Sequence, residues 1–163
     1  MEPGTVSHRK ERMLIEATSS IGIRAAPEAV YGIIADYRSG HPRILPPQYF
    51  GPLVVEQGGV GAGTRIRFTM TVAGRSREAV ADVEEPKPGK VLIERGVSDN
   101  FVTTFTVQPE GPGCFVTIRT SWERGGLQGL IERFTAPRLR MRIFPAELQL
   151  LKQVAEAEAV ART

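Results

Sequence analysis

The last third of the chain constrains the fold most, because it reads as one long amphipathic helix from Leu127 to about Ala157. At about 1.5 Å per residue, a helix of that length is on the order of 45 Å long. It needs a curved sheet in which to lie, and a curved sheet closed by a helix encloses an interior. Apolar residues recur at steps of three and four, the period of one helix face: Leu127, Leu130, Phe134, Pro137, Met141, Phe144, Leu148, Leu151 and Ala155.

Two prolines interrupt this predicted helix. Pro137 and Pro145 each lack a backbone N–H, so each should bend the helix or divide it. One interpretation is a helix that curves to follow the sheet. The other is a hinge that lets the segment 138–144 move as a gate.

The residues before the helix predict one strand, one short helix and an antiparallel meander. Alternating apolar residues make 13–24 a strand, and Ala26-Pro27-Glu28 opens a helix whose buried side runs to Tyr37. Gly40 and three prolines in 39–47 then end the helix. Short turns indicate antiparallel pairing of the further strands, which are expected at 49–56, 64–72, 75–84, 91–95, 100–108 and 114–123.

The turn at Ala73-Gly74 predicts a strand register. A two-residue loop sets Val72 against Arg75, Met70 against Arg77, Phe68 against Ala79 and Ile66 against Ala81, and on the other face Arg65 against Asp82. The inner face is then apolar in its depth and cationic toward the turn. For the last two strands, a four-residue loop sets Phe105 against Ile118, Thr103 against Thr120 and Phe101 against Trp122. A five-residue loop would put Trp122 on the opposite side from Phe101.

Composition restricts the class of protein. The 163 residues, 41% hydrophobic and 24% charged, suit one domain, which we place at 13–158 between a leader at 1–12 and a tail at 159–163. The leader does not resemble a secretory signal and no run reaches the length of a membrane span. A single cysteine, Cys114, excludes an intrachain disulfide, and we expect a cytoplasmic protein.

The arginines of the final helix allow two interpretations of their role. The net charge is +3, and Arg138, Arg140 and Arg142 crowd the final helix. They form either a solvated face or a surface for an anionic partner or membrane. We expect no nucleic-acid partner, because no aromatic platform accompanies the basic groups. Two distant histidines and one cysteine do not make a metal site of the usual ligand type, so no metal is expected. We also expect no other cofactor.

Several segments resemble the START-like (SRPBCC) superfamily, particularly its polyketide cyclase/dehydrase group. They are 21–31 (IGIRAAPEAVY), 34–37 (IADY), 41–46 (HPRILP), 61–65 (GAGTR), 83–86 (VEEP) and 147–152 (ELQLLK). The resemblance covers about residues 13–157. It implies an α+β helix-grip fold, in which a curved antiparallel sheet of about seven strands wraps a long C-terminal helix, with one or two short helices after the first strand. It also implies a mostly apolar cavity, in which relatives bind lipids, sterols, aromatic polyketides or plant hormones and a minority catalyse.

The candidate ligand-binding residues are those expected to face this cavity, although each is as well explained as simple core. Hydroxyl groups and Arg77 would orient a ligand, and Arg77 either clamps an anionic group or extends into solvent. The glycine cluster at 58–63 is interpreted as a mobile loop at the cavity rim. The full set is Tyr37, Tyr49, Phe68, Met70, Arg77, Phe101, Thr103, Phe105, Thr120, Trp122, Phe134 and Met141.

We therefore expect a non-catalytic protein, a monomer or homodimer, that binds, transports or senses a hydrophobic small molecule. The alternative is an enzyme resembling polyketide cyclases or aromatases, which acts by confinement and acid–base chemistry. Arg77, His41 and Thr103 are its weak catalytic candidates, and His41 is equally a loop residue near the entrance. A third class is an interaction module whose arginine-rich helix meets a protein or a membrane.

Overall fold

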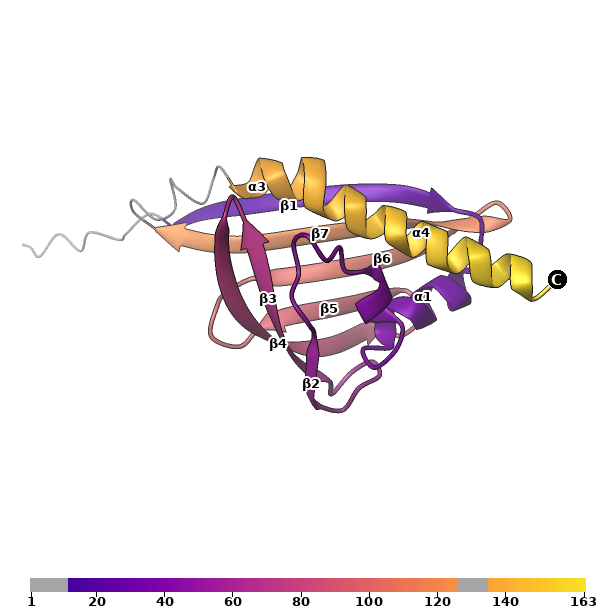
Figure 1. Cartoon of the computed structure of the whole chain (residues 1–163), viewed down its shortest axis with the longest axis horizontal. Coiled ribbons are helices and arrows are strands. Elements are labelled where there is room, and N and C mark those ends of the chain that lie inside the picture. The colour runs from indigo at the N-terminus through magenta and orange to yellow at the C-terminus, as the bar shows by residue number, and fades with distance from the viewer. Residues whose placement is uncertain (1–11, 126–134) are drawn as a thin grey trace, which may run out of the picture.

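A computed structural model describes residues 12–125 and 135–163, and it shows a curved sheet wrapped around a long C-terminal helix (Figure 1). Seven antiparallel strands form the sheet in the order β1-β7-β6-β5-β4-β3-β2. The strands are β1 (Arg12–Ile23), β2 (Val54–Gln57), β3 (Arg65–Val72), β4 (Arg75–Lys87), β5 (Val91–Gly96), β6 (Val102–Glu110) and β7 (Gly113–Gly125). The helices are α1 (Pro27–Ala35), the 3-10 helix η1 (His41–Ile44), α3 (Thr135–Arg138), the π-helix η2 (Leu139–Ile143) and α4 (Phe144–Ala161).

The predicted register of the two hairpins is confirmed. β3 and β4 pair Met70 with Arg77, Phe68 with Ala79 and Arg65 with Asp82. Ala73 and Gly74 have φ of 52° and 75°, as a type I′ turn requires, and this turn matches the twist of the strands it joins. β6 and β7 pair Phe105 with Ile118 and Thr103 with Thr120.

Several strand boundaries differ from the predictions, and β4, for example, continues to Lys87. β6 and β7 continue past the expected loop until Glu110 pairs with Gly113, so their turn is shorter than expected although the register is the same. The predicted strand at 49–56 is wrong at its start, because β2 begins only at Val54. The chain before β2 still runs beside β3, where the Gly51 N–H donates to the Thr69 carbonyl.

The C-terminal helix is continuous from Thr135 to Ala161 and contains a widened turn. In this turn the Phe144 N–H donates to the Leu139 carbonyl, five residues back. Pro145 follows directly; it has no N–H for the Met141 carbonyl, and in a regular α-helix its ring would clash with that group. The widened turn avoids this clash while the helix continues, so it agrees with the interpretation of a helix that follows the sheet.

The widened turn also changes which residues face the sheet. Beyond it, the prediction is confirmed, since Phe144, Leu148, Leu151 and Ala155 are buried. Before it, the prediction is wrong: Leu139 and Ile143 are buried, whereas Pro137 is exposed and Met141 is 69% exposed. One extra residue in the turn rotates the preceding residues around the axis. Leu127, Leu130 and Phe134 lie outside the described residues.

The glycine-rich loop at 58–63 is predicted to lie at the cavity rim, but none of its residues lines the cavity. Its backbone is held to the C-terminal end of α1, where the Gly61 N–H donates to the Ala35 carbonyl and the Tyr37 N–H donates to the Gly59 carbonyl. The loop therefore supports α1 against the sheet. Within the described part of the chain, no helix is both long and apolar enough to cross a membrane.

Candidate functional site: a cavity between the sheet and the C-terminal helix

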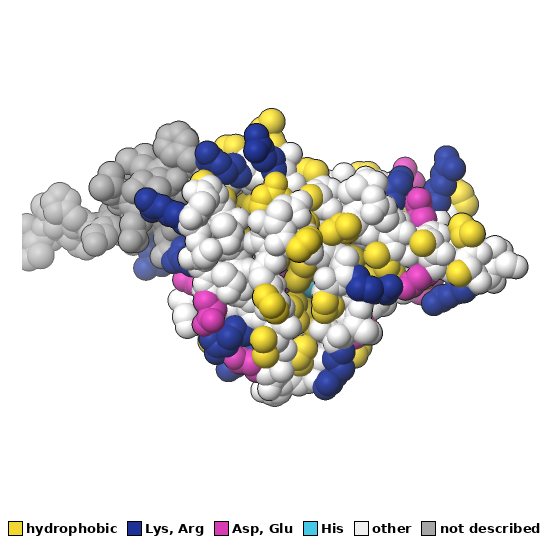
Figure 2. All heavy atoms as spheres, viewed as in Figure 1, with side chains coloured by type: hydrophobic (Ala, Val, Ile, Leu, Met, Phe, Trp, Pro, Cys, Tyr) yellow, Lys and Arg dark blue, Asp and Glu magenta, His cyan; other side chains and the backbone are white. Residues whose placement is uncertain are grey.

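The space between the concave face of the sheet and the C-terminal helix is a cavity of about 550 Å³. Ligand pockets commonly have about 300–1,000 Å³, so this one has the size of a small-molecule site. Figure 2 shows hydrophobic side chains gathered in a band across the face below α4. Most lining residues are apolar, among them Leu45, Phe50, Leu53, Ile66, Phe68, Met70, Val72, Phe101, Phe105, Trp122, Leu139 and Phe144.

The strands place many of the predicted binding residues on the wall of the cavity. Alternate residues of a strand share a face, so Ile66, Phe68 and Met70 of β3 all point inward. Aromatic rings lie close together, with the centroids of Phe68 and Phe101 6.5 Å apart. The predicted residues that line the cavity are Phe68, Met70, Arg77, Phe101, Thr103, Phe105, Thr120 and Trp122. Their contact with a ligand stays a prediction.

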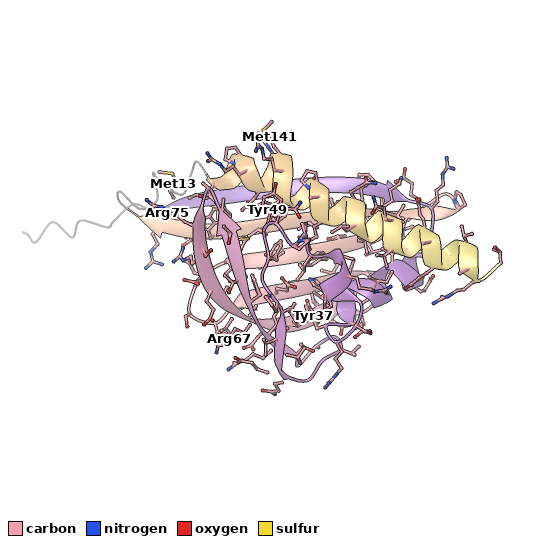
Figure 3. All side chains as sticks on the ribbon, viewed as in Figure 1. Met13, Tyr37, Tyr49, Arg67, Arg75 and Met141 are labelled. Carbon is pink, nitrogen blue, oxygen red and sulfur yellow. The ribbon has the colours of Figure 1, made fainter. Side chains whose placement is uncertain are left out.

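Other predicted residues lie elsewhere. Tyr37 is 1% exposed and lies behind the cavity wall, where its ring stacks on His41 with centroids 4.5 Å apart. Tyr49 is partly buried against the core and is not among the described residues that line the cavity. Met141 faces away from the cavity, because of the widened turn (Figure 3). Phe134 lies outside the described residues.

His41 is not a loop residue near the entrance. It begins η1 and is only 2% exposed, at the inner end of the cavity. Gly40 permits this position, because a Cβ there would lie 2.5 Å from the Ile33 carbonyl oxygen. The His41 Nδ1 lies 2.7 Å from the Ile34 carbonyl oxygen. A carbonyl oxygen only accepts hydrogen bonds, so Nδ1 carries a proton and donates.

Glu94 joins His41 and Tyr37 in a buried polar cluster. Its Oε1 accepts a hydrogen bond of 2.7 Å from the Tyr37 hydroxyl and lies 3.6 Å from the His41 Nε2. Burial, followed by the charge and hydrogen bond of Glu94, raises the pKa of Tyr37 well above its usual value, so the hydroxyl stays protonated and donates. Glu94 faces inward because it alternates with buried Leu92 on β5. The sequence does not reveal this, since Val91 and Ile93 on the opposite face are also apolar.

Glu147 is the second acid at this end, and the predicted site did not include it. It is 3% exposed, lines the cavity, and makes no hydrogen bond through its carboxyl within residues 12–125 and 135–163. Burial first, and then the charge of Glu94, raise its pKa well above the usual range. A signal for it existed in the sequence: Glu147 follows Phe144 by three residues and precedes Leu151 by four, in the middle of the apolar stripe.

The mouth of the cavity is cationic and exposed. Arg75 and Arg77 of β4 lie there with Asp99 and Asn100. The Arg77 side chain is 61% exposed, and its Nη2 lies 3.6 Å from Asp99 Oδ1. In Figure 3, Arg75 lies at the β3–β4 turn, far from Tyr37, which lies beside α1. The three weak catalytic candidates thus share the cavity, but Arg77 lies at the mouth and His41 at the inner end.

The remaining candidate groups have ordinary surroundings. Thr103 and Thr120 line the cavity, and their hydroxyl oxygens are 2.8 Å apart, so they bond to each other. Burial raises the pKa of the Cys114 thiol, which therefore stays protonated. Across the described residues, no group of three His, Cys, Asp or Glu side chains is placed to hold a metal ion. Arg140 and Arg142 are exposed beside Met141 on the outer side of the helix.

Comparisons with known proteins agree with this fold. The KanY protein is 32% identical over 88% of this chain and 99% of its own, with a TM-score of 0.77. A START superfamily protein from Mycobacterium smegmatis is 12% identical over 87% of this chain and 97% of its own, with a TM-score of 0.68. The di-domain ARO/CYC StfQ from the steffimycin biosynthetic pathway is 15% identical, with a TM-score of 0.71 over 90% of this chain and 52% of its own.

A search of the curated proteins found no match. The family comparison is more informative, because residues 15–156 match the profile described as polyketide cyclase/dehydrase and lipid transport. This match includes all seven strands in part or whole, α1, η1 and most of α4. With its helix-grip fold, this chain belongs to the polyketide cyclase/dehydrase and lipid transport family.

Proposed function

We propose that this protein binds a hydrophobic small molecule, of lipid, polyketide or aromatic type, in the cavity and carries or senses it without transforming it. The single observation that supports this most is a largely apolar space of about 550 Å³ inside one domain. A protein interior normally packs closely, so an apolar space of this size weakens the fold unless something fills it. Burial of a ligand's apolar surface contributes roughly 25 cal/mol per Å², less the cost of ordering the ligand.

Native mass spectrometry of freshly purified protein tests the proposal. The expected result is a small molecule that co-purifies with the folded chain and is released on unfolding. Where the cavity is empty after purification, the fluorescent apolar probe 1-anilinonaphthalene-8-sulfonate should bind with a stoichiometry of one.

Variants connect this binding to the cavity. Ala79 lines the cavity opposite Phe68, so Ala79→Phe should fill part of the space and weaken probe binding. Val80 is the next residue on the same strand and points to the outer face, so Val80→Phe is the matched control. Absence of any co-purified molecule together with equal probe binding by both variants would contradict the proposal.

The second candidate function is a cyclase-like enzyme, and the inner end of the cavity is the observation that favours it. His41, Glu94 and Glu147 bring acid and base groups to an otherwise apolar space. In an aldol closure, an enol carbon attacks a ketone carbon, a base takes the enol proton and an acid protonates the oxygen of that ketone. Elimination of the new hydroxyl group, with a proton from the neighbouring carbon, then releases water. The aromatase/cyclase class of StfQ would suit such chemistry.

A turnover assay separates the two candidates. The protein is incubated with a synthetic poly-β-keto thioester, and the products are followed by mass spectrometry against an uncatalysed control. The enzyme candidate predicts accelerated loss of water, and Glu147→Gln should slow it while leaving substrate binding little changed. A rate equal to that of the control would leave the carrier function as the sole proposal.

A further inference from the structure

We propose that the inner end of the cavity is a proton-donating site, at which the Glu147 carboxyl holds a neutral oxygen acceptor of the bound molecule, such as a ketone. This inference rests on the proposed binding function and adds the chemical class of the ligand. It predicts a hydrophobic molecule that enters with a carbonyl group leading toward η1 and α4.

The position of Glu147 is the first argument. Its side chain is nine-tenths buried or more, it lines the cavity, and its carboxyl has no hydrogen-bond partner among the described residues. Among the described residues, every fully buried polar side-chain atom has a hydrogen-bond partner. The carboxyl oxygens of Glu147 have none, so they are not fully enclosed, and the accessible space beside them is the cavity. Buried polar groups are nearly always hydrogen-bonded, because an unmade bond is costly. A ligand in the cavity is the partner that the protein itself does not provide.

The protonation of Glu147 is the second argument. Its raised pKa means that the neutral acid persists to higher pH than for an exposed glutamate. A protonated carboxyl has one O–H donor to offer. The titratable groups facing it are Glu94 of β5 and His41 of η1, with Tyr37 behind them. The other charged residues that line the cavity, Arg75, Arg77 and Asp99, are at the mouth.

The surroundings of Glu147 explain why the ligand group should be neutral. Glu94 Oε1 accepts the Tyr37 hydroxyl and lies 3.6 Å from His41 Nε2, so Glu94 already has partners within the chain. An anionic ligand group would lose its hydration beside these two acids without gaining a counter-ion. A cationic group would gain one only after Glu147 had lost the proton that its raised pKa retains.

Three probes of one shape test the proposal: 2-acetylnaphthalene, with a ketone, 2-isopropylnaphthalene, with a hydrocarbon group in its place, and 1-(2-naphthyl)ethylamine, with an ammonium. Affinities are measured by calorimetry at pH 6. The ketone should bind about tenfold more tightly than the hydrocarbon, as one additional hydrogen bond provides. The amine should bind more weakly than the ketone. The carbonyl resonance of 13C-labelled 2-acetylnaphthalene should move downfield on binding.

Substitutions identify which side chain donates the hydrogen bond to the ketone. Glu147→Gln retains an N–H donor, so it should retain the preference for the ketone. Glu147→Leu should remove the preference while binding the hydrocarbon at least as well. Thr104→Val removes a hydroxyl on the outer face of β6, next to cavity-lining Thr103, and should leave the preference unchanged. As pH rises through the pKa of Glu147, the wild type should lose its preference because the acid loses its proton, whereas Glu147→Gln should not change.

The outcomes separate this inference from the function beneath it. If none of the three probes binds, the proposed binding function fails. If all three bind and the ketone has no advantage in the wild type, binding stands and the proton-donating site is overturned. Tightest binding of the amine, or a preference for the ketone that persists in Glu147→Leu, would overturn it as well. Circular dichroism of each variant checks that the fold is retained.

Discussion

The two ends of the cavity contain similar kinds of charged groups in opposite surroundings. At the inner end, His41, Glu94 and Glu147 are buried and surrounded by apolar side chains. At the mouth, Arg77 and Asp99 form an ion pair of similar length, but solvent reaches both. Burial strengthens each interaction and makes each missing partner costly, whereas water screens the pair at the mouth. Buried charged groups at the inner end therefore stabilise the fold more than the exposed pair at the mouth does, and the predictions below compare the two ends.

The largest expected difference between the two ends comes from removing an acid. Glu94→Leu leaves the Tyr37 hydroxyl and His41 without their partner in a buried site, and it should lower the free energy of unfolding by about 3 kcal/mol. Urea denaturation measures the loss. The matched change at the mouth, Asp99→Leu, should cost less than about 1 kcal/mol. Equal losses would show that burial does not distinguish the two ends.

The hydroxyl of Tyr37 should have a smaller but clear effect. Tyr37→Phe removes one hydrogen bond to Glu94 and should lower the free energy of unfolding by about 2 kcal/mol, as for bonds to charged groups. Tyr49→Phe is the control, because the Tyr49 hydroxyl makes no hydrogen bond within the described part of the chain. Thermal unfolding of both variants measures the difference. Equal midpoints would show that the hydrogen bond from Tyr37 to Glu94 does not stabilise the fold.

The pH dependence of stability should single out Glu147. Its pKa is higher in the folded than in the unfolded protein, so between the two values the folded state binds more protons. The free energy of unfolding should then fall as pH rises, by about 1.4 kcal/mol per pH unit, and level off above the folded pKa. Glu147→Gln should remove this fall, so its advantage over the wild type grows with pH. If the stabilities of the wild type and Glu147→Gln changed in parallel from pH 5 to 8, the pH dependence could not be assigned to Glu147.

At the mouth, Arg77→Ala should change stability by less than about 0.5 kcal/mol, because its ion pair is exposed. It should instead slow association of the anionic probe 1-anilinonaphthalene-8-sulfonate, more at low salt than at high salt. Arg119→Ala, on a strand face away from the cavity, changes the net charge equally and serves as control in stopped-flow measurements. An equal effect of both variants would indicate net charge rather than position.

Much of the fold could be predicted from local patterns. The Ala73-Gly74 turn and the alternation of β3 and β4 specify which strand residues meet, because turn geometry and the two-residue period leave few registers. Local patterns could not predict which residues before Pro145 face the sheet. The regular period of an α-helix predicts that Met141 faces inward, whereas one widened turn rotates it outward. Pro145 indicates that the helix is interrupted, but it does not indicate by which geometry.

The sequence alone determined the strand order of the hairpins, the long final helix and the apolar walls, since each depends on periodic burial that neighbouring residues repeat. The tertiary structure decided that His41, Glu94 and Glu147 meet at one end of the cavity. They come from η1, β5 and α4, and no local rule relates segments so far apart in the chain. A buried acid amid an apolar stripe can be noticed in the sequence, but its partners exist only once the sheet has curved around the helix.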